Sequence, residues 1–233
     1  MRACLAVLFT VLVAYGLLCT ATGTSAQKGE PVRRTGHEVL SVAALYRDSI
    51  RPLTPTHTLE LAFAYFPEAG WSPQILIDAA RAAAGILRQC GILVSTLELH
   101  RLKGDARFHY YATSRSRELA RRLPLRRPTV YFIAETLQRP AFDAEAIGRG
   151  NSKTRPELAD TVWITRNARD LALVLMHELV HVLMDSGEHV EEPGNLMRAE
   201  TAPENTRLDA AQCARLRDTA VAHGLLHPAE KAK

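Results

Sequence analysis

Residues 168–184 constrain the fold of this chain most strongly, because they must form a buried helix that also carries ionisable side chains. An apolar run, LALVLM, leads directly into His177, Glu178 and, four residues after the first histidine, His181. Residues four apart on a helix lie on the same face, so both imidazoles can reach one metal ion. A buried helix cannot cheaply hide two imidazoles and a carboxylate without a partner, and a metal ion is such a partner. The HExxH pattern therefore predicts a metal-binding helix, with Glu178 placed to take a proton from water held at the metal.

Two histidines do not complete a catalytic zinc site, which usually has three protein ligands and a water. His189 is the favoured third ligand, because Gly187 would let the chain leave the helix and turn back toward the metal. Carboxylates in the same loop remain alternatives, and a more distant glutamate would be a further one. These alternatives are Asp185, Glu188, Glu191, Glu192 and Glu204.

Hydrophobic periodicity and turn residues predict an alternation of strands and helices along the rest of the chain. Ser72 and Pro73 are typical of a helix start, and Asn167 or Asp170 can cap the helix that carries the HExxH pattern. The order of elements indicates a mixed α/β (α+β) fold, in which helices pack on a mixed, twisted sheet. Strands are expected at 59–66, 92–99, 129–134 and 161–165, with an edge strand at 144–149, and helices at 73–89, 113–123, 168–184 and 206–223.

The segment HELVHVLMDSGEH followed by PGNLM resembles the metzincin clan of zinc metallopeptidases, whose members carry HExxHxxGxxH and then a turn that contains methionine. The resemblance implies a zincin-type fold with an active-site helix, a methionine turn and a C-terminal helix. It also implies that Zn²⁺ is the cofactor, with His177, His181 and His189 as ligands, Glu178 as general base and Met197 as the turn methionine. This chain departs from the pattern: Met184 stands at the glycine position, Gly187 stands at the third-ligand position, and His189 is displaced by two residues. Ala199 stands where the clan has a tyrosine, two residues after the turn methionine.

The N-terminus has the layout of a secretory signal peptide. Arg2 precedes an apolar run, and small residues end at Ala26. A membrane anchor is the alternative, since the run approaches the ~20 residues that span a bilayer. We predict a signal peptide at 1–26, a loosely attached N-terminal extension at 27–56 and a metzincin-like zinc peptidase domain at 57–233. The protein would then be exported to the periplasm or secreted, without stable membrane insertion.

The two cysteines outside this leader, Cys90 and Cys213, are an even pair in an exported protein and so are compatible with one disulfide. Two buried free thiols are the alternative. Six arginines between residues 115 and 127 are interpreted as a solvated helix face, and no nucleic-acid-binding motif accompanies them. His100, His109, His223 and His227 lack ligand spacing and are interpreted as surface residues.

Together these features predict an exported zinc endopeptidase whose partner is a peptide or protein substrate, bound extended along the edge strand near residues 144–150. Two alternatives share the metal site. One is a non-catalytic, zinc-stabilised binding protein, and the other is a hydrolase that acts on cell-wall peptide.

Overall fold

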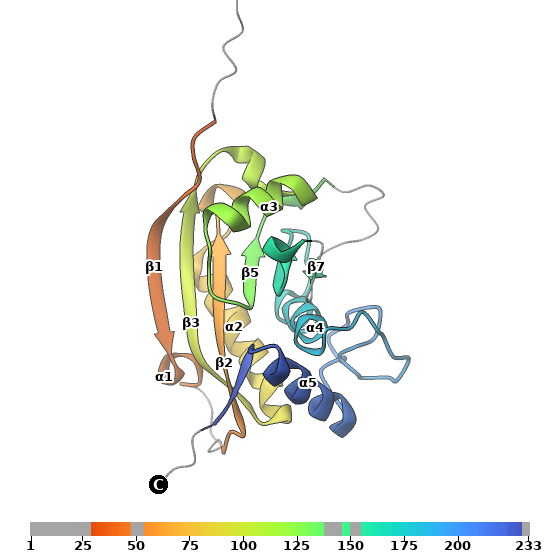
Figure 1. The fold of residues 1–233 in the computed structure, drawn as a ribbon. Coiled ribbons are helices and arrows are strands. Elements are labelled where there is room, and N and C mark those ends of the chain that lie inside the picture. The colour runs from red at the N-terminus through yellow and green to blue at the C-terminus, as the bar shows by residue number, and fades with distance from the viewer. Residues whose placement is uncertain (1–28, 48–53, 138–145, 150–154, 230–233) are drawn as a thin grey trace, which may run out of the picture.

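The computed structural model describes residues 29–47, 54–137, 146–149 and 155–229, with only the main chain at 146–149 (Figure 1). The predicted signal peptide at 1–26 lies outside the described residues. Among the helices of these ranges, none has the length and apolar character that crossing a bilayer requires.

The main sheet is mixed, as the sequence predicts. Its strands follow the order β1-β3-β2-β5-β8-β7, and β9 pairs with β2. The central strands β3, β2, β5 and β8 are parallel, whereas β1 and β7 run antiparallel at the two edges. The strands of this sheet are β1 (Arg33–Ser41), β2 (His57–Tyr65), β3 (Ile92–Lys103), β5 (Thr129–Phe132), β7 (Ala146–Arg149), β8 (Thr161–Ile164) and β9 (Leu226–Pro228). A short second sheet pairs β4 (Tyr110–Tyr111) with β6 (Glu135–Thr136).

The helices lie on both faces of the sheet. Figure 1 shows α2 behind the strands and α3 in front of their upper ends. Helix α2 packs against α4, which in turn contacts α5. The helices are α1 (Val42–Leu45), α2 (Pro73–Leu87), α3 (Thr113–Arg122), α4 (Leu171–Met184) and α5 (Ala210–Ala222), with 3-10 turns η1 (Pro67–Ala69), η2 (Arg88–Cys90), η3 (Ala106–His109) and η4 (Pro156–Leu158).

Polar caps determine where the three long helices begin. The Ser72 hydroxyl accepts a hydrogen bond from the Ile75 amide, so the predicted start of α2 is confirmed. Asp170 caps α4, which begins at Leu171 rather than at residue 168. The last helix begins four residues later than predicted, because Asp209 forms a capping box with Gln212.

The N-terminal segment is not loosely attached where the structure describes it. Residues Arg33–Ser41 form β1, which pairs with β3 along almost its whole length, from Arg33 opposite Lys103 to Ser41 opposite Thr96. This pairing also explains why β3 continues to Lys103, beyond the predicted end at residue 99. Alternation alone did not identify β1, because its burial pattern is mostly exposed.

The core lies between the parallel strands and the helices. Every residue of β5 and β8 is buried, as expected for central parallel strands covered on both faces. Trp163 stacks on Tyr131 with ring centroids 4.1 Å apart, and Tyr111 meets the same indole edge-on at 5.3 Å. This layer supports α4, whose side chains are buried at ten of its fourteen positions.

A disulfide joins Cys90 in η2 to Cys213 in α5 across a sequence separation of 123 residues. Of the two alternatives left open by the sequence, the disulfide is therefore confirmed. It ties the end of α2 to the C-terminal helix that packs on α4.

Candidate metal centre

Helix α4 presents the HExxH residues at the margin of the core. His177 is buried, with 5% of its surface exposed, whereas Glu178 and His181 are half-buried. The helix is apolar around most of its circumference, because it packs against α2, α5 and the strand β8. The ionisable side chains are therefore held on a rigid, well-packed element.

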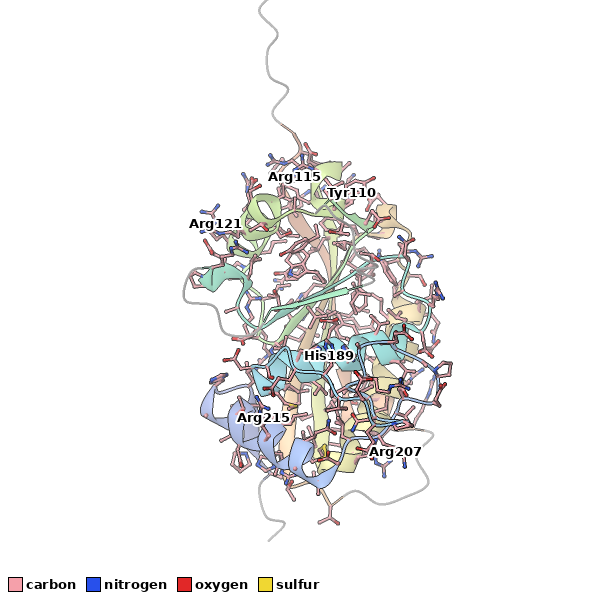
Figure 2. The ribbon with its side chains drawn as sticks, turned by 90° about the vertical axis from the view of Figure 1, so that its right-hand side faces the viewer. Tyr110, Arg115, Arg121, His189, Arg207 and Arg215 are labelled. Atoms are coloured by element: carbon pink, nitrogen blue, oxygen red, sulfur yellow. A yellow bond between two sulfur atoms is a disulfide. The ribbon has the colours of Figure 1, made fainter. Side chains whose placement is uncertain are left out.

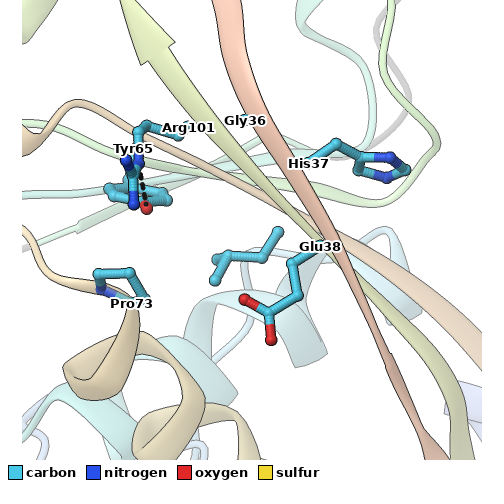
Figure 3. A pocket seen from close by; sticks show the side chains of 7 residues that line it. Gly36, His37, Glu38, Tyr65, Pro73 and Arg101 are labelled. Carbon is cyan, nitrogen blue, oxygen red and sulfur yellow. Dashed lines mark hydrogen bonds between the residues drawn. The ribbon is translucent and has the colours of Figure 1, made fainter.

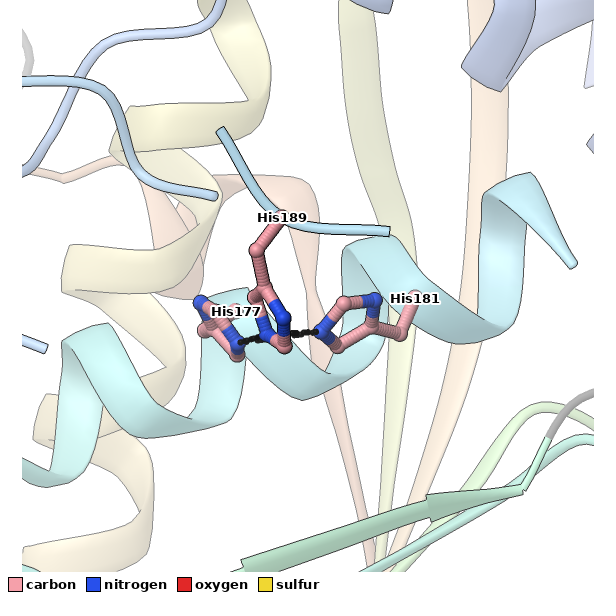
Figure 4. Close-up of side chains that lie close together, drawn as sticks. All are labelled: His177, His181 and His189. Atoms are coloured by element: carbon pink, nitrogen blue, oxygen red, sulfur yellow. Dashed lines mark hydrogen bonds between the residues drawn. The ribbon is translucent and has the colours of Figure 1, made fainter. Parts of the chain in front are cut away.

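Three imidazoles converge at this place. His177 and His181 lie one turn apart on α4, and His189 reaches them from the loop that follows (Figure 4). The Nε2 atoms of His177 and His181 are 3.0 Å apart, and the Nε2 of His189 lies 3.2 Å from each of them. His189 is exposed, so this side of the cluster is open to solvent (Figure 2).

Backbone carbonyls determine which nitrogen of each helical histidine faces the others. The Nδ1 of His177 lies 2.8 Å from the Leu196 oxygen, and the Nδ1 of His181 lies 2.7 Å from the Ser186 oxygen. Because a carbonyl only accepts hydrogen bonds, each Nδ1 carries the proton and each neutral ring directs an Nε2 lone pair at its neighbour. Two lone pairs at 3.0 Å repel each other unless a cation lies between them.

The protonation states also suit a cation. Burial, followed by the nearby His177, lowers the pKa of His181 to about 4. Burial likewise lowers the pKa of His177, although its bond to the Leu196 carbonyl acts in the opposite direction. Both imidazoles are therefore neutral near pH 7, which is the form that binds metals.

The donor set fits zinc. Nitrogens about 2.0–2.1 Å from a tetrahedral zinc ion lie about 3.3 Å from one another. The observed separations of 3.0–3.2 Å are close to this value. Carbonyl groups that orient the ligands through their second nitrogen are also the usual outer partners of metal-bound histidines.

The turn Pro193–Met197 supports His177 from below. The Asn195 side chain accepts a hydrogen bond from the Met197 amide at 2.9 Å and exchanges two more with Gln212 of α5. These contacts fix Leu196, whose carbonyl holds the imidazole of His177. Glycine suits this turn at Gly194, because its φ is +78°, a left-handed conformation that other residues rarely adopt.

The loop that carries His189 leaves the helix at Asp185, and not at Gly187 as the sequence predicts. Asp185 adopts a left-handed conformation with φ of 45°, whereas Gly187 has no such conformation. After this turn, Glu188 bonds Arg215 of α5 at 2.5 Å, and the Val190 amide bonds the Met197 carbonyl at 2.9 Å. The loop is thus tied down on both sides of His189.

The carboxylates considered as alternative ligands do not join the cluster in the described part of the chain, where the group comprises only the three histidines. Glu188 faces Arg215 instead, and that bond lowers the pKa of its carboxyl. Sequence reasoning did not identify the roles of Ser186, Asn195 or Leu196, because two of them act through backbone carbonyls and carry no residue-type signal.

The isolated histidines divide into two kinds. His223 and His227 are exposed, as expected, but His100 and His109 are buried, so their assignment to the surface is wrong. His109 packs against Phe66 with ring centroids 4.7 Å apart. His100 belongs to a second group of side chains at the β1 edge of the sheet.

Sequence comparisons with known proteins do not identify a family for this chain. No protein-family model matches this chain, and no curated protein matches it. Among solved structures, the chain is similar to metalloproteinase-II from Bacteroides fragilis, with 16% identity and a TM-score of 0.49 over 76% of this chain. The matched part spans 60% of that protein. Similarity at this level leaves the chemistry to be inferred from the residues of this chain.

Proposed function

We propose that this protein is an exported, zinc-dependent metallopeptidase of the metzincin type. The observation that carries this proposal is the convergence of three imidazole Nε2 atoms at 3.0–3.2 Å, with the Nδ1 atoms of His177 and His181 already committed to carbonyl oxygens. The resemblance of the HELVH and PGNLM segments to the metzincin clan supports the same function. So does the exposure of His189, because a purely structural zinc site is usually closed by four protein ligands.

His177, His181 and His189 would hold the zinc ion. When bound, zinc supplies a Lewis acid that polarises a peptide carbonyl and makes water acidic enough to ionise near pH 7. Glu178 would accept the proton of the attacking water and then deliver it to the amine nitrogen that leaves. Its half-buried position beside His177 on α4 suits this role, since a carboxylate there is held rigidly yet remains accessible.

The substrate would be a peptide or protein bound in extended form along β7. This strand pairs with β8 through one edge, and no strand in the described residues covers its other edge. It also contacts α4, so a chain added at that edge would pass close to the histidines. Backbone hydrogen bonds to an edge strand would hold the scissile bond in place with little dependence on sequence.

Glu178→Gln tests the proposal, because it removes the base while keeping the size and polarity of the side chain. We expect zinc content and folding to be retained, and hydrolysis of a fluorogenic peptide library to fall at least ~100-fold. Glu191→Gln is the matched control, since the same chemical change in the exposed loop should leave activity intact. Full activity in Glu178→Gln would refute the mechanism.

His181→Ala tests the metal requirement separately. We expect this variant to lose both bound zinc and activity, while the wild type retains one zinc ion at this site after extensive dialysis. A wild-type protein that binds zinc but cleaves no denatured protein or peptide would instead favour the non-catalytic binding protein.

A further inference from the structure

A second group of potential metal ligands lies at the edge of the sheet remote from β7. His37 on β1 pairs directly opposite His100 on β3, and Glu98 precedes His100 by two residues on the same strand. Alternate residues of a strand share a face, so the three side chains project to one side of the sheet. We call His37, Glu98 and His100 the sheet-edge cluster; their ligand atoms all lie within 4.8 Å of one another.

The opposite face of the same strands is different in character. There, Glu38, Tyr65 and Arg101 line a hollow of about 230 Å³. Figure 3 shows the ring of His37 turned away from the Glu38 carboxylate, on the other side of β1. His37 is also among the residues that line this hollow, whereas Glu98 and His100 are not. The sheet-edge cluster is separate from the three histidines near α4.

The ligand atoms of the cluster lie at distances compatible with one shared cation. Glu98 Oε2 lies 3.1 Å from His100 Nε2 and 3.5 Å from His37 Nε2. Within the described residues the His100 side chain is only 1% exposed, and its Nε2 has the Glu98 carboxylate as an ion-pair partner but no other polar partner. Two ligands of one tetrahedral cation are about 3.3 Å apart and point at the cation, not at each other.

The surroundings leave one carboxylate oxygen available. Arg126 donates to Glu98 Oε1 at 3.1 Å and also pairs with Glu60, so Glu98 is oriented with Oε2 toward the two imidazoles. A charged group that holds the outer oxygen of a ligating carboxylate is a common feature of metal sites. Arg34 donates a hydrogen bond to His100 Nδ1 at 3.5 Å, so the proton of the neutral His100 ring lies on Nε2. Cation binding through Nε2 therefore requires this proton to move to Nδ1 and the exposed Arg34 guanidinium to withdraw into solvent.

The His37 ring must also rotate for all three ligands to meet a cation. The rings of His37 and His100 are stacked, with centroids 4.6 Å apart and an interplanar angle of 2°. A metal ion cannot lie in the planes of two parallel rings at once. Because the His37 side chain is 38% exposed, its ring can rotate and direct Nε2 at a position near Glu98 Oε2 and His100 Nε2.

We propose that the sheet-edge cluster binds a divalent cation of the zinc class, and that the bound ion fastens β1 to β3. Two imidazoles and one carboxylate are a ligand set that prefers Zn²⁺, Ni²⁺ or Cu²⁺ to Mg²⁺ or Ca²⁺. The ion would join residues that lie more than sixty positions apart in the chain and would anchor the edge strand. This site is independent of the proposed peptidase activity.

Metal stoichiometry tests the proposal. The full chain is stripped with a chelator, dialysed against Zn²⁺ and analysed for bound metal. We expect two zinc ions per chain in the wild type, one in His37→Ala, one in His181→Ala and none in the double variant. His227→Ala, at an exposed histidine outside both clusters, should keep two. Equal zinc content in the wild type and in His37→Ala would overturn the proposal, whatever the occupancy of the histidine site on α4.

Hydrogen exchange provides a second readout, which measures the pairing of β1 with β3 rather than the amount of bound metal. In the His181→Ala background, only the sheet-edge cluster would bind zinc. If binding requires β1 to be paired, opening of the β1–β3 hydrogen bonds should slow by the factor 1 + [Zn²⁺]/Kd, about 100-fold at a zinc concentration of 100 Kd. Glu98→Gln, which keeps an oxygen for Arg126, should abolish the effect. Equal exchange of the β1 amides with and without zinc would contradict the proposed fastening.

Discussion

Removing the Cys90–Cys213 disulfide should cost this protein a large part of its stability. The bond closes a loop with a sequence separation of 123 residues. In the chain-entropy model, a loop of that length lowers the entropy of the unfolded state by roughly 16 cal/mol/K, or about 5 kcal/mol at 25 °C. Measured losses on removing native disulfides are about 2–5 kcal/mol. We therefore expect the double variant Cys90→Ala/Cys213→Ala to lose about 3–5 kcal/mol of unfolding free energy.

The assay is guanidinium unfolding at saturating zinc, in a chain that begins at Gln27, where these are the only two cysteines. Wild-type protein reduced with dithiothreitol is the control. It loses the cross-link but keeps both sulfur atoms in the core, where Cys90 is 1% and Cys213 is 6% exposed. The reduced wild type should account for most of the loss seen in the alanine variant. A difference below about 1 kcal/mol between oxidised and reduced wild type would refute the loop-closure reasoning.

Three further perturbations probe the surroundings of the histidines and the buried core. Asn195→Ala leaves the Met197 amide and Gln212 without their partner, so we expect a loss of about 1–3 kcal/mol in unfolding free energy. Because Leu196 then holds His177 less firmly, the zinc Kd from chelator competition should rise about 10-fold. Arg215→Ala frees Glu188 beside the third histidine and should raise the zinc Kd without changing the melting temperature of the metal-free protein. His109→Phe should make stability less sensitive to acid. Burial lowers the pKa of His109, so the unfolded state binds the proton first and stability falls as pH drops below about 6.5. Chemical unfolding between pH 7 and pH 5 measures this. The unfolding free energy of the variant should fall less steeply with decreasing pH than that of the wild type, by at most about 1.4 kcal/mol per pH unit.

Arg215→Ala and His109→Phe each have a matched control variant. Arg115→Ala, at the far end of the molecule from Arg215, should leave zinc affinity unchanged (Figure 2). If both arginine variants behave alike, the bond to Glu188 does not position the loop. His223→Phe, at an exposed histidine, should keep the wild-type acid slope. An unchanged zinc Kd in Asn195→Ala would show that the Leu196 carbonyl is held by other contacts.

Local sequence patterns predicted most helices and strands, because helix caps and hydrophobic periodicity involve residues that are close together in the chain. Ser72 and Asp170 cap helices whose apolar residues recur at helical spacing, and the strands around Tyr131 and Trp163 are continuous apolar runs. The main failure was β1. Most of its residues are exposed, so its pairing with β3 depends on backbone hydrogen bonds that leave no hydrophobic signature.

The turn after α4 was also predicted at the wrong residue. Glycine is the usual residue for a left-handed conformation, and Gly187 was therefore the expected turning point. The structure uses Asp185 instead, whose amide bonds the Val182 carbonyl while the Ser186 amide bonds that of His181. Contacts made further along the loop, from Glu188 to Arg215 and from Val190 to Met197, stabilise this path.

The sequence alone determined that His177 and His181 face the same way, because helical geometry places residues four apart on one side whatever the rest of the chain does. Tertiary structure alone decided that His189, rather than a neighbouring carboxylate, meets them, and that Cys90 bonds Cys213. It also decided that His37 lies opposite His100. Each of these pairings joins two segments that are brought together only when the strands adopt their register and the loops close. Such contacts depend on the packing of the whole chain and not on spacing within any one stretch of it.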